Sequence, residues 1–146
     1  MECAGQVALG PLAGIANVDD RDLAGSEPGR WNRKPELEPP PEPVTLGELE
    51  IDVAPYPLVG ASRDEAGRLC GARGGRLCTE LEWERACKGP ASFPFANGSE
   101  LDPRCSTASC LSGFGVRGLG FLREWTASDL EGSSAARAIL RGAGPA

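Results

Sequence analysis

Histidine is absent from the 146-residue chain, and lysine is scarce, with two residues against thirteen arginines. Without histidine, the chain cannot use Ser–His–Asp or Cys–His catalysis, nor histidine-ligated zinc. Aromatic residues make up only 5% of the sequence, which predicts a small hydrophobic core. No apolar run approaches the ~18 residues that a membrane helix requires, so we expect no membrane span.

Negative charge is concentrated in the N-terminal third of the chain. Residues 1–53 carry a net charge of −7, whereas residues 54–146 carry +1. Neither part is basic enough to neutralise a phosphate backbone, so no nucleic-acid partner is expected. Residues 1–44 mix acidic and turn-forming residues and include five prolines between positions 35 and 43. This composition predicts an acidic, proline-rich flexible linker ahead of a folded domain over residues 45–146.

Two patterns in the middle of the chain predict helix starts. Residues 62–65 (SRDE) and 79–82 (TELE) each place a hydroxyl three residues before a glutamate, as in a capping box. The glycines at 74–75 should end the first helix. The second helix should run to about Cys87, ahead of the Gly–Pro pair at 89–90.

Strands are expected on both sides of these helices, and all of them are short. Within residues 46–58, apolar residues alternate with acidic ones at Leu49, Ile51 and Val53, which predicts a strand that Pro55 and Pro57 should end. Residues 121–127 (FLREWTA) and 136–144 (ARAILRGAG) predict two more. The 20 glycines and 13 prolines of the chain indicate that loops occupy much of the remainder.

The order of these segments resembles the sulfatase-modifying-factor family, that is, formylglycine-generating-enzyme-like domains of bacteria. Residues 75–84 (GRLCTELEWE) are similar to the family run G-K-R-L-x-T-E-x-E-W-E. Residues 93–97 (FPFAN) loosely match Y-P-W/Y-G-N, residues 114–126 match parts of F-G-L-Y-D-M-x-G-N-V-x-E-W-T, and residues 141–143 stand where the family has R-G-G. The resemblance covers roughly residues 48–146.

The resemblance implies an α+β, C-type-lectin-like fold with two short helices, small twisted sheets and abundant loops. It also implies a set of structural motif residues, which are Arg76, Thr79, Glu82, Trp83, Glu84, Glu124, Trp125 and Arg141. We expect Trp83 to be a buried anchor whose indole N–H finds an acceptor. Three glutamates at alternate positions from residue 80 cannot all point one way on a helix, so we expect no metal cage there.

The cysteines are candidates for disulfides if the protein is exported. Those within the domain are Cys70, Cys78, Cys87, Cys105 and Cys110. The sequence leaves their pairing open, although Cys87 with Cys105 or Cys110 is a plausible connection between the second helix and the following loop. We expect no metal site and no cofactor. Calcium is doubtful, because Gly118 and Phe121 stand where the family has oxygen-bearing side chains.

The resemblance also bears on activity. The reactive cysteine pair of the family follows the R-G-G motif, whereas every cysteine of this chain precedes Arg141. We therefore expect no catalytic residue and a non-catalytic module that binds a protein or ligand, with a protein partner favoured. One alternative is a fragment of the copper-dependent oxidase that converts sulfatase cysteine to formylglycine, with copper as its cofactor. Another is a structural domain of the cell envelope, and an exported location is slightly favoured in either case.

Overall fold

The fold is α+β, as predicted, with two helices and three small antiparallel sheets among the described residues. The computed structural model describes residues 7–8, 12–16, 42–56, 58, 60–93, 98–100, 102, 105, 109–119, 121–130 and 137–142, and side chains from Val44 onward. The C-type-lectin-like arrangement remains a prediction.

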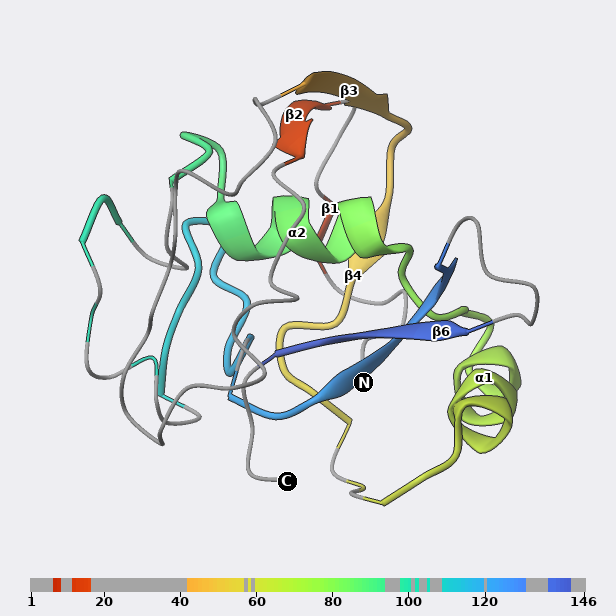
Figure 1. Ribbon diagram of the computed structural model, residues 1–146. Coiled ribbons are helices and arrows are strands. Elements are labelled where there is room, and N and C mark those ends of the chain that lie inside the picture. Colours follow the sequence, from red (N-terminus) through yellow and green to blue (C-terminus); the bar gives the residue numbers. More distant parts are fainter. Residues whose placement is uncertain are drawn as a thin grey trace.

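Each sheet pairs two strands. The pairs are β1 (Val7–Ala8) with β4 (Glu50–Ile51), β2 (Leu12–Ala16) with β3 (Glu42–Leu46), and β5 (Glu124–Asp129) with β6 (Ala138–Arg141). Helix α2 (Glu80–Lys88) lies between the β2–β3 sheet and the β5–β6 sheet and contacts both (Figure 1). The molecule thus has a central helix, with strands from both ends of the chain packed around it.

The N-terminal segment differs from the flexible linker predicted for residues 1–44. Its apolar stretches at 7–8 and 12–16 form strands that pair with β4 and β3, and β3 begins at Glu42, inside the proline-rich run. Apolar residues of this segment pair with later strands, although the acidic residues around them led us to predict no strand there. The other residues of 1–41 lie outside the described residues, and for them the linker remains a prediction.

Both predicted helices form, and their caps explain their positions. The Ser62 hydroxyl accepts a hydrogen bond from the Glu65 amide at the start of α1 (Arg63–Ala72). Thr79 and Glu82 form a complete capping box at the start of α2. Gly74 and Gly89 follow the helices with φ values of 79° and 70°, a conformation that glycine adopts without a Cβ penalty. Two hydroxyls and two glycines therefore set the bounds of both helices.

The strand predicted around Leu49, Ile51 and Val53, ahead of Pro55, is shorter than expected. Only Glu50–Ile51 forms β4, in which Ile51 is fully buried and Val53, two residues on, is already exposed. The two C-terminal strands do form, as β5 and β6, and pair with each other across a bulge. Gly142 ends β6 with a φ of 98°, and a side chain there would collide with the Leu122 carbonyl.

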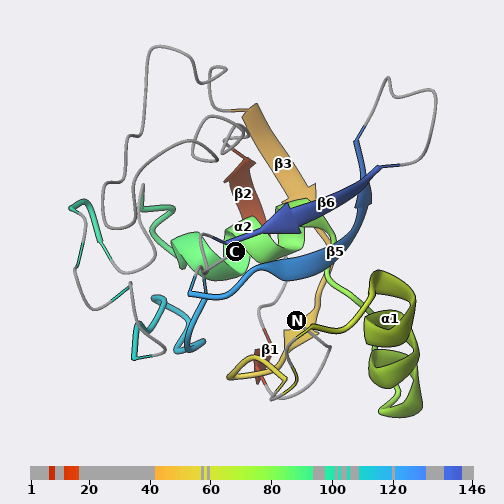
Figure 2. The ribbon, with the colours of Figure 1, turned by 60° about the horizontal axis from the view of Figure 1, so that its bottom comes forward.

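Helix α1 lies beside β5 (Figure 2), and arginine and tryptophan side chains hold the two elements together. Arg63 donates from Nε to the Thr126 carbonyl at 2.9 Å and from Nη1 to Asp129 at 2.7 Å. The indole of Trp125 donates to the Ala61 carbonyl, just before α1, at 2.8 Å. These contacts join residues more than 60 positions apart and give α1, which has only two buried side chains, its place in the fold.

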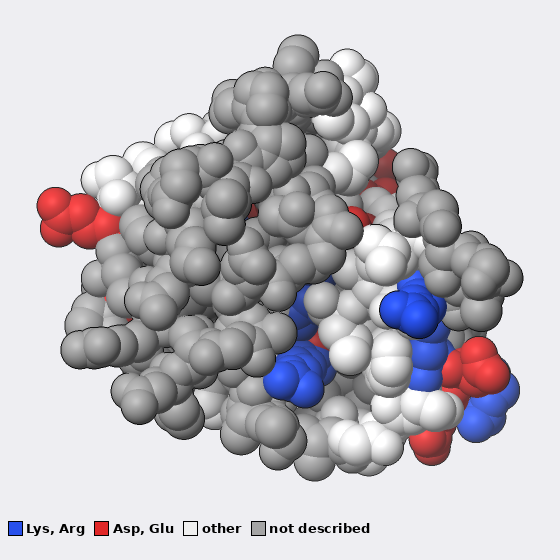
Figure 3. Space-filling view, viewed as in Figure 1, with Lys and Arg blue, Asp and Glu red and all other residues white. Residues whose placement is uncertain are grey.

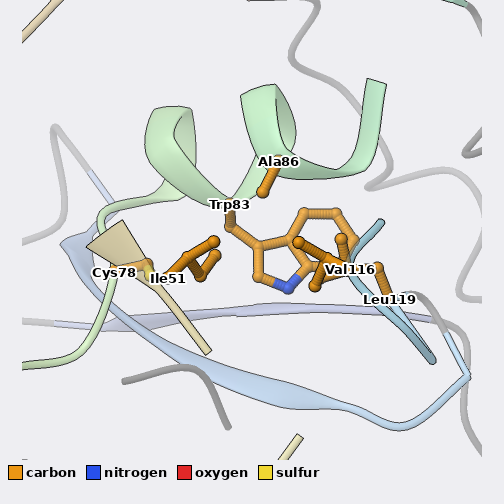
Figure 4. Packing of buried hydrophobic residues seen from close by; sticks show 6 residues of the cluster. All are labelled: Ile51, Cys78, Trp83, Ala86, Val116 and Leu119. Atoms are coloured by element: carbon orange, nitrogen blue, oxygen red, sulfur yellow. The ribbon is translucent and has the colours of Figure 1, made fainter. Parts of the chain in front are cut away.

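The hydrophobic core lies beneath α2. Its main cluster comprises Ile51, Cys78, Trp83, Ala86, Val116 and Leu119 (Figure 4). A smaller cluster of Ala66, Cys70 and Leu77 lies under α1 and is covered in part by Trp125. The main cluster therefore centres on Trp83, the largest of its side chains, and this is where the motif residues converge.

Candidate functional site

Trp83 occupies the middle of the candidate site. The side chain is only 4% exposed, and its indole lies between Ile51 on one side and Val116 and Leu119 on the other (Figure 4). Its Nε1–H donates a hydrogen bond to the carboxylate of Glu124, which is fully buried on β5. The prediction of a buried anchor with an acceptor for its N–H is confirmed.

Charged side chains that are largely buried lie around Trp83. The Arg141 guanidinium lies over the indole ring at 5.3 Å from the ring centroid, a cation–π contact. It also donates to Glu80 and Glu84, each at 3.3 Å. Lys88 completes the group with an ion pair to Glu84 at 2.7 Å. We call Glu80, Trp83, Glu84, Lys88, Glu124 and Arg141 the Trp83 centre.

Helical spacing explains which glutamates join the Trp83 centre. Glu80 and Glu84 are four residues apart, so their side chains lie on one face of α2, where both contact Arg141. Glu82 is rotated away from that face and turns to Arg76 instead. The three carboxylates are therefore divided between two arginines.

The Arg76–Glu82 pair stabilises the start of α2. Both terminal nitrogens of Arg76 donate to the Glu82 carboxylate at 2.7 Å, and Glu82 also accepts from the Thr79 amide at 2.8 Å. The hydrogen bond from Arg76 is the main reason that the pKa of Glu82 is lowered, because it favours the charged carboxylate. The same bond raises the pKa of Arg76.

Trp125 is the motif residue that the structure separates from the others. It follows Glu124 on β5, and successive side chains of a strand point to opposite faces. Its indole is half-buried against the α1 cluster and donates to the Ala61 carbonyl. Trp125 therefore positions α1, while Glu124 belongs to the Trp83 centre.

The cysteine pairing differs from the connection considered for Cys87. Cys105 is bonded to Cys110, and their Cα atoms are 4.4 Å apart, within the usual range for a disulfide. Cys78 and Cys87 carry thiols, the first in the main core and the second half-buried beside it. The disulfide is thus local, because its two cysteines are five residues apart in the sequence, and it does not connect this part of the chain to α2.

The sequence analysis did not identify several residues that contribute to these contacts. Lys88 could have been found, because it lies one helical turn after Glu84. Arg85 is buried and donates to the Gly89 carbonyl at 2.9 Å and to the Ser92 hydroxyl at 2.8 Å, and burial lowers its pKa. The role of Arg63 could not be predicted from its neighbours, because its partners on β5 are more than 60 residues away in the sequence.

In the part of the chain that the structure describes, no cluster of three or more metal-ligating side chains is present. Neither described helix has the length and apolar character to cross a membrane. Comparisons with protein-family models, curated proteins and solved structures found no match.

Removing the central indole should destabilise the domain severely. Trp83→Ala leaves a cavity under α2 and should cost ~3–5 kcal/mol of unfolding free energy, measured by urea titration with circular dichroism. Trp83→Phe keeps a ring but removes the donor to Glu124, and we expect an intermediate loss. Leu58→Ala, at an exposed position, is the control. Wild-type stability in Trp83→Ala would contradict the central role of this residue.

Stability should also depend on the charge of Glu82 at acid pH. The folded-state pKa is held below the ordinary value of 4.5, so the folded protein binds fewer protons here than the unfolded chain. The stabilisation is fully present above that value and is lost as pH falls through the lowered pKa. Arg76→Gln should flatten this part of the profile of unfolding free energy against pH. Arg68→Gln, which removes an exposed arginine of α1, should not, and equal profiles for both variants would refute the pairing.

Proposed function

We propose that this chain is a non-catalytic domain of the sulfatase-modifying-factor type that binds a protein partner. The observation that carries the proposal is the convergence of the motif residues on Trp83. Glu84 comes from α2, Glu124 from β5 and Arg141 from β6, and their polar groups contact one another or the indole in the interior. Side chains that are buried and paired with one another hold the fold together, whereas a catalytic group must be able to reach a substrate. Their arrangement therefore supports a scaffold role.

Exposed apolar side chains near this scaffold support a binding role. Val53 and Leu111 are 38% and 45% exposed. The Arg117 amide donates to the Val53 carbonyl at 2.8 Å, and Leu111 bridges to Arg117 across a short hairpin. Two loops that are distant in sequence are thereby joined side by side. Grouped exposed apolar residues are typical of protein-contact surfaces.

The disulfide supports a location outside the reducing cytoplasm. The Cys105–Cys110 bond lies directly before Leu111, so it fixes the start of the hairpin that carries this apolar residue. Disulfides persist in oxidising compartments such as the bacterial periplasm. A binding module of the cell envelope is consistent with this chemistry.

The first test concerns catalysis. We expect that the chain, supplied with copper and oxygen, leaves the cysteine of a C-x-P-x-R peptide unconverted, because Cys78 is buried in the core and Cys105 and Cys110 are bonded to each other, so they offer no accessible thiolate pair. Mass spectrometry of the peptide after incubation is the measurement, with an active formylglycine-generating oxidase as the positive control. Reproducible conversion of the thiol to an aldehyde that depends on this chain would overturn the proposal.

The second test concerns binding through the apolar loops. A photo-crosslinking amino acid placed at Leu111, in protein expressed in its native cells, should give one defined protein adduct on a denaturing gel. The same amino acid at the exposed Arg68 of α1 is the matched control and should give none. Identical adduct patterns at the two positions would contradict a partner that docks at this surface.

A further inference from the structure

The two outer edges of the β5–β6 sheet differ in whether their backbone groups have hydrogen-bond partners among the described residues. On β5, the Arg63 guanidinium donates to the carbonyls of Thr126 and Ala127 at 2.9 and 2.7 Å. The Ala127 amide donates to the Cys78 carbonyl at 2.7 Å. Side-chain and backbone groups therefore occupy the β5 edge, which closes it to another strand.

The described residues leave the β6 edge without a neighbouring strand. The carbonyls of Ile139 and Arg137 both point to β5, because they accept from the Thr126 hydroxyl at 2.9 Å and the Leu130 amide at 2.7 Å. In an antiparallel pair, alternate residues direct their N–H and C=O groups toward the partner strand and away from it. The backbone groups of Ala138 and Leu140 therefore point away from β5.

Nothing in the described part of the chain takes up these outward groups. Among the described residues, Ala138 and Leu140 make no backbone hydrogen bond outside the β5–β6 pair. The Leu140 side chain is 41% exposed and offers an apolar surface at the same edge. β6 runs along the near side of the sheet in the second view (Figure 2).

We propose that the β6 edge binds an extended, acidic segment of a protein partner as an added strand. Main-chain hydrogen bonds to Ala138 and Leu140 would hold the segment, and an apolar side chain would pack on Leu140. This inference deepens the binding role proposed above and rests on it. It names the class of partner and the backbone groups that the partner meets.

Charge favours an acidic segment over a second copy of the chain. Arg137 is the exposed charged side chain of residues 137–142, which contain no acidic residue, whereas Arg141 is buried and paired with Glu80 and Glu84. Asp129, opposite Ala138 in the ladder, is already paired with Arg63 at 2.7 Å. A second β6 strand would offer Arg137 no acidic partner, because residues 137–142 contain none, whereas an acidic segment would pair with it. In the space-filling view, the region over β6 shows uncharged atoms next to basic side chains (Figure 3).

The test is a selection from a phage-displayed library of random peptides of about twelve residues, followed by affinity measurement with the full chain. We expect the enriched peptides to carry Asp or Glu and to alternate them with apolar residues. Leu140→Pro removes the outward N–H without removing a ladder hydrogen bond and should weaken binding about tenfold or more. Leu140→Ala keeps that N–H and removes only the side-chain contact, so it should weaken binding less than Leu140→Pro.

Two further measurements keep the proposal falsifiable even where a proline variant fails to fold. In the wild-type complex, the Ala138 and Leu140 amides should become protected from hydrogen exchange, as followed by NMR. Arg137→Glu should weaken the acidic peptides and strengthen versions with Lys in place of Glu, a reversal that loss of folding cannot produce.

Three outcomes would overturn the inference. The first is the absence of any enriched peptide, and the second is binding that Leu140→Pro and Arg137→Glu leave unchanged. The third is self-association of the chain through β6 in analytical ultracentrifugation, which would identify a second copy as the occupant. The crosslinking experiment at Leu111 tests the protein-binding role without involving β6. Failure of the binding role can therefore be distinguished from failure of strand addition at β6.

Discussion

The buried guanidinium of Arg141 lies against the face of Trp83 and between Glu80 and Glu84, and this contact joins α2 to β6. Taking such charges out of water is costly, and the cost is offset only while each has its partner. Removal of one member of a buried pair is therefore far more damaging than loss of an exposed ion pair. The position of α2 over the β5–β6 sheet depends on this arrangement, and the hydrophobic core forms beneath it.

Local chemistry made part of this fold predictable. A hydroxyl at Thr79 and a carboxylate at Glu82 fix the start of α2 within a few residues, and Gly89 ends it. The burial of Trp83 also followed from its type and position. Such features depend on neighbours within one or two turns, and these neighbours can be read directly from the sequence.

Long-range contacts could not be predicted in the same way. Arg63 reaches Asp129, and Trp125 reaches Ala61, across more than 60 residues, and neither spacing has a sequence signature. The strands of the N-terminal segment were hidden by its acidic and proline-rich composition. The pairing of Cys105 with Cys110 could not be deduced either, because cysteine spacing alone permits several connections.

The distance along the chain between the members of the Trp83 centre has a consequence for synthesis on the ribosome. A nascent chain that stops before Arg141 already contains Glu80 and Glu84 on one face of α2, yet lacks the guanidinium that lies between them. Burial of that face without the arginine would place two carboxylates near each other in a poorly solvated interior. The domain should therefore complete its fold only after β6 has left the exit tunnel.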